Sequence, residues 1–214
     1  MDALEKLIAQ YPPLKACKED IEGAFILMRD SFKGGGKLLV CGNGGSAADS
    51  EHIVGELMKG FMLPRKVPQA DRAKFNSVSP VNGDYISDNL QGALPAISLV
   101  SQSAIISAFS NDVAPDMVFA QQVYGYGRLG DTLLGLSTSG NSKNVIYAAE
   151  TAKAMGLSTI SLTGESGGQL KDICHCTIRV PSEITPSIQE YHLPIYHTLC
   201  IMIEREFFCE HNRD

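Results

Sequence analysis

Residues 38–56 read Leu-Leu-Val-Cys-Gly-Asn-Gly-Gly-Ser-Ala-Ala-Asp-Ser-Glu-His-Ile-Val-Gly-Glu, and the rest of the chain is organised around this stretch. The apolar run 38–41 predicts a short buried strand. A turn with three glycines follows, where small residues permit positive φ and a close backbone approach. Ser46 stands where a helix begins, and good helix formers continue to Met58. Free N–H groups and the positive end of the helix dipole meet there, so the stretch predicts an anion-binding site.

The same predicted helix carries a candidate acid–base pair. His52 and Glu56 are four residues apart and therefore share a helix face. At about 1.5 Å per residue, both lie within about 15 Å of the glycine turn. A phosphate cradle next to a histidine and a carboxylate indicates chemistry on a phosphorylated small molecule.

Composition sets the class of protein. The chain has 214 residues, is 44% hydrophobic and 20% charged, and therefore resembles a globular domain with a substantial core. A net charge of −6 and a pI near 5.4 argue against nucleic-acid binding. No apolar run approaches the roughly 18 residues of a membrane span, and the N-terminus lacks the pattern of a secretion signal. The six cysteines are expected to be reduced thiols, most of them in the core, so we expect a cytoplasmic protein.

Strands and helices are expected to alternate along the chain. Apolar runs predict strands over 38–41, 96–100, 131–136, 158–162 and 176–180. Helical spacing predicts two N-terminal helices within 1–33 and further helices over 46–58, 101–109, 117–126, 143–155 and 187–208, with a polar turn at 110–112 and a solvated helix end at 204–206. This alternation predicts one α/β domain over residues 1–214, a doubly wound parallel sheet of five strands whose ligands bind at the carboxyl ends of the strands.

The segment 61–95 is the least regular part of the chain. It contains Pro64, Pro68 and Pro80, two glycines and a weak amphipathic patch near 85–90. We expect a long irregular connection there. Loops of this length in compact domains are often functional, so a surface excursion, a lid over the ligand and an interface arm all remain open.

A second polar turn follows the predicted strand 131–136. Leu136-Ser-Thr-Ser-Gly-Asn-Ser142 places four hydroxyls at the end of a strand and the start of a helix, where O–H and N–H donors could surround a phosphate. Alone, such a cluster is better explained as helix capping. Because a matching turn follows the strand 38–41 at the same sheet edge, we interpret both turns as one phosphate site.

The last predicted helix adds further polar side chains. Gln189 and His197 lie on a helix that is otherwise largely apolar, and together with His52 and Glu56 they form a donor set that suits zinc or another divalent ion. Eight helical residues separate Gln189 and His197 by about 12 Å, too far for one ion on a straight helix. Either Pro194 distorts this helix or a second subunit completes the set.

These residues match a known family. The sequence resembles the sugar isomerase (SIS) domain proteins and, within them, the phosphoheptose isomerases, also called sedoheptulose 7-phosphate isomerases. The resemblance covers about residues 20–208. The matching motifs are Gly42-Asn-Gly-Gly-Ser46, the His52/Glu56 spacing, Asn111-Asp112, Leu136-Ser-Thr-Ser-Gly-Asn-Ser142, Leu162-Thr-Gly164 and Ile188-Gln-Glu-Tyr-His-Leu-Pro-Ile-Tyr-His197.

The resemblance implies a fold, a reaction and residue roles. It implies a flavodoxin-like strand order and a homotetramer with active sites between subunits. It also implies conversion of sedoheptulose 7-phosphate to D-glycero-D-manno-heptose 7-phosphate through an enediol, the first step of nucleotide-activated heptose synthesis. Glu56 would be the base and His197 the acid, and one zinc ion per subunit would be bound by His52, Glu56, Gln189 and His197. The residues expected to contact substrate are Asn43, Gly44, Gly45, Ser46, Asn111, Asp112, Ser137, Thr138, Ser139, Ser142 and Gln189, of which Ser46, Ser137, Thr138, Ser139 and Ser142 would hold the phosphate.

Two other functions remain open from the sequence. One is a non-catalytic SIS protein that associates with a replication initiator, against which the intact His/Glu/Gln/His set argues. The other is an isomerase for a different phosphosugar, because phosphate contacts say little about the sugar. A phosphosugar-responsive transcription factor is disfavoured, since no DNA-binding segment or basic face precedes the domain.

Overall fold

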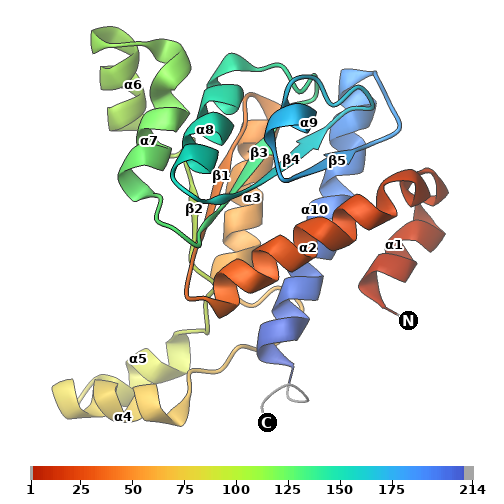
Figure 1. Ribbon diagram of the computed structural model, residues 1–214. Coiled ribbons are helices and arrows are strands. Elements are labelled where there is room, and N and C mark those ends of the chain that lie inside the picture. Colours follow the sequence, from red (N-terminus) through yellow and green to blue (C-terminus); the bar gives the residue numbers. More distant parts are fainter. Residues whose placement is uncertain (1, 210–214) are drawn as a thin grey trace.

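A five-stranded parallel sheet forms the centre of the protein (Figure 1). The computed structural model describes residues 2–209. The strand order is β2-β1-β3-β4-β5, which confirms the predicted doubly wound sheet and its flavodoxin-like order. Leu38 of β1 pairs with Ala96 on one side and with Thr132 on the other. The strands are β1 (Leu38–Cys41), β2 (Ala96–Ser98), β3 (Thr132–Leu136), β4 (Ser158–Thr163) and β5 (Cys176–Arg179).

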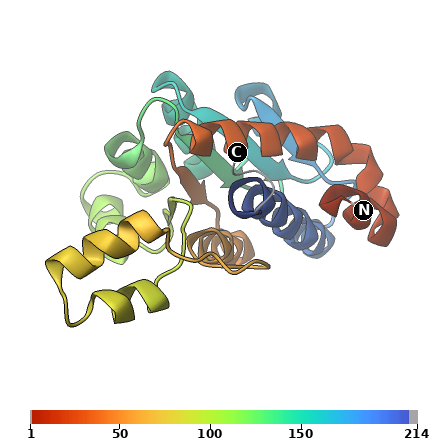
Figure 2. The same ribbon diagram turned by 90° about the horizontal axis from the view of Figure 1, so that it is seen from below.

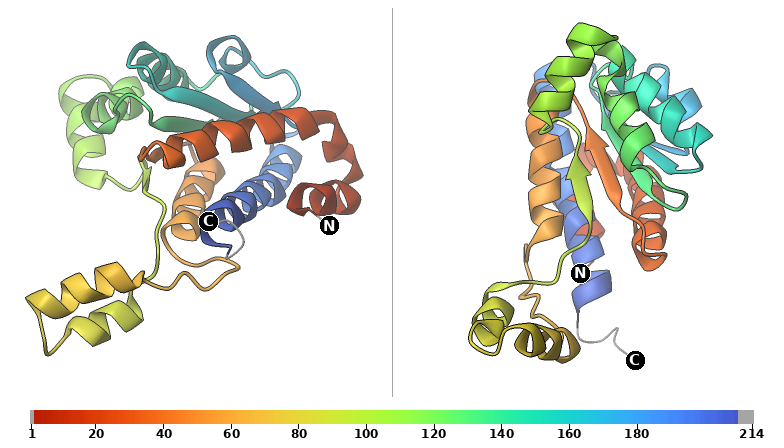
Figure 3. Two further views of the ribbon diagram at one scale, coloured as in Figure 1. Left: turned by 60° about the horizontal axis from the view of Figure 1, so that its bottom comes forward. Right: turned by 90° about the vertical axis from the view of Figure 1, so that its left-hand side faces the viewer.

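Two apolar clusters pack against the sheet. Leu38 and Val40 of β1 join one cluster with side chains of the N-terminal helices, α3 and α10. Leu39 and Cys41 join the other, with α7 and α8. This alternation is the two-residue period of a strand buried on both faces. Figure 3 shows α3 and α10 on one side of the sheet and α8 on the other.

The helices agree largely with the expected spans. The N-terminal elements are α1 (Ala3–Gln10), the short 3₁₀ helix η1 (Pro12–Cys17) and α2 (Lys18–Lys33). The main-body elements are α3 (Gly45–Met58), α6 (Ser103–Asp112), η2 (Pro115–Met117), α7 (Val118–Tyr126), α8 (Lys143–Ala154), α9 (Leu170–Ile173) and α10 (Thr185–Phe208). None of the helices in residues 2–209 combines the length and the hydropathy that a membrane span requires.

The segment 61–95 differs from the irregular connection that we expected. It contains two helices, α4 (Gln69–Val78) and α5 (Gly83–Asn89), which pack on each other as a hairpin. Arg72 holds them together through Asp84 at 2.9 Å and Asp88 at 2.6 Å. Because α4 buries none of its side chains, the segment lacks the apolar periodicity by which a helix is recognised in sequence. Figures 1 and 2 show the hairpin standing away from the sheet.

Residues 110–112 also differ from the expected polar turn. They form the last turn of α6, which ends where the Val113 N–H donates to the carbonyl of Phe109. Asn111 donates to the Asp112 carboxylate at 2.8 Å, a local bond that the helical backbone accommodates. Individual residues have only weak preferences against helix, so the three polar residues 110–112 continue α6 and do not end it.

Candidate active site

The glycine turn after β1 has the geometry of an anion cradle. Gly44 has φ of +57°, a backbone conformation that favours glycine. The turn places Ser46, which is buried, in the first turn of α3. A Cβ on Gly42 would lie 2.6 Å from the carbonyl oxygen of Ser46, so this position also requires glycine. The amino end of α3, with the positive end of its helix dipole, thereby lies at the carboxyl edge of the sheet, and there the N–H groups of Ser46 and Ala47 donate to the carbonyls of Asn43 and Gly44.

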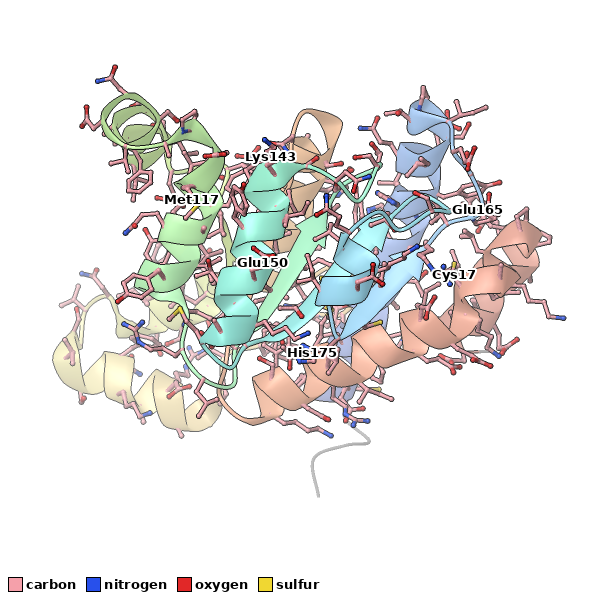
Figure 4. All side chains as sticks on the ribbon, turned by 45° about the horizontal axis from the view of Figure 1, so that its top comes forward. Cys17, Met117, Lys143, Glu150, Glu165 and His175 are labelled. Atoms are coloured by element: carbon pink, nitrogen blue, oxygen red, sulfur yellow. The ribbon has the colours of Figure 1, made fainter. Side chains whose placement is uncertain are left out.

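The serine-rich turn after β3 lies at the same edge. Ser137 and Ser142 bring their hydroxyls to 3.0 Å across it. Gly140 has φ of +66°, and a Cβ there would lie 2.1 Å from the carbonyl oxygen of Gly167. Thr138 and Ser139 line an adjacent hollow of about 230 Å³. Figure 4 shows Lys143 at the start of α8 and Glu165 after β4 marking this edge, with His175 at the opposite one.

A reciprocal amide pair joins the two turns. Asn43 donates to Asn144 at 2.9 Å, and Asn144 donates back to Asn43 at the same distance. The bonds connect the β1 turn with the first turn of α8, which confirms that both turns lie at one edge of the sheet. Sequence analysis did not identify Asn144. The available signal was its position, because it is a polar residue two places after Ser142 in the first turn of the predicted helix.

Three of the four predicted metal and catalytic side chains come together between α3 and α10. Figures 1 and 2 show these helices side by side. His52 Nε2 lies 3.3 Å from Glu56 Oε1 and 3.5 Å from His197 Nε2. His52 thus lies between the carboxylate and the second imidazole. The three side chains therefore lie close together, and their roles as base and acid stay predictions.

Gln189 lies apart from these three. It packs against Gly45, where a Cβ would come 2.6 Å from Gln189 Nε2. Pro194 does not interrupt α10, which runs from Thr185 to Phe208, so Gln189 and His197 stay about 12 Å apart. Within residues 2–209, no group of three or more His, Cys, Asp or Glu side chains has the arrangement of a metal site. The donor types suit zinc, but one chain does not assemble the four donors.

A hydrogen-bond chain orients His52. The hydroxyl of Tyr196 donates to Asp49 Oδ1 at 3.1 Å and lies 3.1 Å from His52 Nδ1. These contacts hold the ring so that its Nε2 faces Glu56 and His197. Sequence analysis missed Asp49 and Tyr196. The signal was the spacing of Gly45, Asp49, His52 and Glu56, which form one helical stripe facing α10.

Burial and neighbouring groups shift the pKa of His197. Burial and then the neighbouring His52 lower the pKa of His197, and the Glu56 carboxylate opposes them. Neutral imidazole is therefore favoured at pH 7. Glu56 is largely buried, with its side chain 12% exposed, and Lys59 lies 3.2 Å from its other oxygen. Burial also raises the pKa of Asp49.

Asn111 and Asp112 lie outside this cluster. Both are exposed at the end of α6, and Asn111 donates to Asp112. Among the bonds of residues 2–209, none links either side chain to the glycine turn, the serine-rich turn or the histidine cluster. Their role in contacting sugar hydroxyls stays a prediction.

Comparison with known proteins places this fold and site in a class. A model of the SIS domain matches residues 13–87 and 90–164, well over half of the chain. The chain therefore contains an SIS domain, and β1, β3 and the turns that follow them lie within the matched residues.

Individual relatives narrow the class. A phosphoheptose isomerase of Akkermansia muciniphila is 37% identical over 92% of this chain and 91% of the relative. One of Citrifermentans bemidjiense is 41% identical over 88% of this chain and 84% of the relative. The solved phosphoheptose isomerase of Neisseria gonorrhoeae superposes with a TM-score of 0.71 at 33% identity over 93% of both chains. The chain therefore belongs to the phosphoheptose isomerase family of SIS-domain proteins.

Proposed function

We propose that the protein converts sedoheptulose 7-phosphate to D-glycero-D-manno-heptose 7-phosphate, the first step of nucleotide-activated heptose synthesis. Family membership over most of the chain supports the reaction. The structural observation that best supports this reaction is the close approach of His52, Glu56 and His197. His52 and Glu56 belong to α3, the helix that begins at the glycine turn. A non-catalytic protein that binds a partner through its surface has no need of this cluster.

The phosphate would be bound by the two turns. Ser46, Ser137 and Ser142 supply hydroxyls, and the amino ends of α3 and α8, with the positive ends of their dipoles, follow the two turns. No cationic side chain is required, because hydroxyls and helix ends supply the donors. The amide pair between Asn43 and Asn144 keeps the turns at a constant separation.

Acid–base chemistry would be carried by Glu56 and His197. Conversion of the ketose removes one proton from C1 and adds one to C2, while O1 loses its hydroxyl proton and O2 gains one. A carboxylate suits the carbon-bound protons and an imidazole the oxygen-bound ones. Glu56 Oε1 lies 3.3 Å from His52 Nε2, so the carboxylate is held in a defined place beside the imidazoles.

We further propose that zinc is bound by His52, Glu56, Gln189 and His197, with the four ligands contributed by more than one subunit. Two imidazole nitrogens, a carboxylate and an amide oxygen are ligands that zinc accepts. When bound, a divalent ion polarises oxygens on C1 and C2. Glu56 does not easily serve as both a tight ligand and a free base, so this proposal needs its own test. Metal analysis of purified protein should show about one zinc per chain, and His52→Ala should abolish it.

We also propose a homotetramer in the cytoplasm with active sites between subunits. The His52 side chain is 43% exposed in the single chain, and Gln189 lies too far from it to join the same site. A neighbouring subunit would supply what is missing. The six cysteines are free thiols, consistent with a reducing compartment. Light scattering should give the mass of four 23.1 kDa chains.

The experiment that tests the function is a substrate comparison. Purified protein is incubated with sedoheptulose 7-phosphate, fructose 6-phosphate or ribulose 5-phosphate, and aldose formation is followed by NMR. We expect turnover of the heptulose phosphate with a kcat/KM at least tenfold above the shorter sugars. No turnover of the heptulose phosphate, or a preference for a shorter ketose, would overturn the heptose assignment.

A further inference from the structure

A fully buried ion pair lies next to the candidate active site. Arg65 follows α3 and Glu204 belongs to α10, and both side chains are 0% exposed. Their Nε and Oε1 atoms are 2.9 Å apart, and the guanidinium also stacks 4.6 Å from the ring centroid of Phe208. The sequence had predicted a solvated helix end at 204–206, which is wrong for Glu204. Neither side chain has a role in the reaction described above.

The guanidinium caps the end of α3. Arg65 Nη1 donates to the carbonyl of Leu57 at 2.6 Å, and Nη2 donates to the carbonyl of Glu56 at 3.0 Å. The last carbonyls of a helix have no partner within it, so an outside donor there satisfies them. One of the two capped residues is Glu56 itself. Arg65 therefore holds the backbone that carries the proposed base.

The carboxylate holds the chain that follows α3. Glu204 Oε1 accepts from the Phe61 N–H and Oε2 from the Met62 N–H, each at 2.7 Å. Glu204 is seven residues after His197 on α10, which places both on the same face of that helix. The pair thus connects the backbone of Glu56 with the helix that carries His197.

We propose that Arg65 and Glu204 are positioning residues that hold Glu56 and His197 at their working separation. Stability alone does not account for the pair, because replacing buried ion pairs by apolar residues is often neutral or stabilising. What apolar residues would not supply is the set of four directed bonds to backbone groups at 56, 57, 61 and 62. Misplacement by about 1 Å can cost about 100-fold in rate. The inference rests on the proposed isomerase function.

The test separates positioning from substrate binding. Arg65→Lys keeps the charge but loses the planar fork that reaches the carboxylate and two carbonyls. Glu204→Gln keeps the shape but loses one acceptor oxygen. For each variant we expect kcat to fall at least fivefold with KM changed less than twofold, because the phosphate turns lie at the other end of α3. A smaller fall in kcat, or a larger change in KM, would overturn the proposal.

Two controls keep the result interpretable. Arg128→Lys alters an exposed arginine that donates to the carbonyls of Gly125 and Gly127 at the end of α7, and its kcat should not change. If either single variant fails to fold, the apolar pair Arg65→Met/Glu204→Leu replaces it. This double variant lacks every bond of the ion pair and should show the same loss of kcat with KM unchanged.

A substrate-free readout distinguishes failure of this proposal from failure of the proposed function. Hydrogen–deuterium exchange is measured over 57–62 and over 45–50. We expect the variants to exchange at least tenfold faster over 57–62 and at the wild-type rate over 45–50. Unchanged exchange over 57–62 refutes the positioning role even in an active enzyme. Wild-type protein without turnover refutes the isomerase, whatever the exchange shows.

Discussion

His192 is a buried imidazole on the helix that also carries His197. It is fully buried on α10, and its Nε2 lies 3.3 Å from the carbonyl oxygen of Thr163. Its Nδ1 has no hydrogen-bond partner among residues 2–209. Burial lowers the pKa of His192 from 6.5 to about 4, despite the favourable bond to Thr163. The side chain is therefore neutral in the folded protein throughout the working pH range.

This histidine makes stability depend on pH. Below pH 6.5 the unfolded chain binds a proton at His192 that the folded protein does not bind above about pH 4. We therefore expect its contribution to be complete above pH 6.5 and to decline by about 1.4 kcal/mol per pH unit as pH falls toward 4. Urea denaturation at several pH values should show a shallower decline for His192→Gln. Identical pH dependence in both proteins would contradict the neutral assignment.

Gly140 offers a second test at a single residue. Gly140→Ala combines positive φ with a Cβ 2.1 Å from the backbone oxygen of Gly167. We expect a loss of at least about 1–2 kcal/mol in unfolding free energy, the cost of left-handed backbone for alanine. KM for the phosphosugar should also rise, because the serine-rich turn shifts. Thermal melts and steady-state kinetics measure both.

The control for Gly140 is a glycine with free space. In the described part of the chain, no atom beyond its own helix backbone and chain neighbours would lie within 4 Å of a Cβ on Gly125 in α7. Gly125→Ala should therefore stabilise the protein by about 0.5–1 kcal/mol, the helix preference of alanine. Equal stability of the two alanine variants would show that the turn geometry is not as described.

At the scale of elements, sequence reasoning succeeded where burial was strong. β1 covers the expected residues because an apolar run marks it in the sequence. α8 ends close to the expected residue because Gly156, which has φ of +77°, stops the helix. On the face of α3 that contacts α10, the sequence analysis identified His52 and Glu56 but not Asp49. Asp49 and Tyr196 act through a contact between two helices, and a single sequence does not show which helices touch.

The four-donor set shows the same limit. His52, Glu56 and His197 meet because α3 and α10 pack side by side, with Gln189 about two turns away beside Gly45. α10 continues through Pro194, so the separation of about 12 Å expected from the rise of a helix still applies. The sequence pattern did not predict which side chains of α10 would contact those of α3.

At the scale of the whole molecule, the α4–α5 hairpin is separate from the core. It packs on itself, and the bridge between Lys66 and Gln91 closes its base. Its exposed apolar residues include Val78, Val81 and Tyr85. Its function as a lid or an interface arm stays a hypothesis. Helices without a buried face are stabilised by local pairs, which explains why composition alone suggested a loop.

Removal of the hairpin should leave the folded body intact. Replacing residues 69–89 by a short Gly-Ser linker should keep cooperative unfolding and change the melting temperature by less than about 4 °C, equivalent to about 1 kcal/mol. Circular dichroism measures this. Loss of cooperative unfolding would show that the hairpin belongs to the core. Light scattering on the same protein tests the interface hypothesis, which predicts a smaller assembly.

The central claim is that Glu56 moves the carbon-bound proton of a heptose phosphate. The most direct measurement is turnover of sedoheptulose 7-phosphate in deuterium oxide by wild type and Glu56→Gln, followed by NMR. We expect the wild type to form heptose 7-phosphate with deuterium at C2, and Glu56→Gln to lose at least about 100-fold in kcat, within the usual range for a general base. Turnover that survives Glu56→Gln, or product without deuterium at C2, would contradict this account.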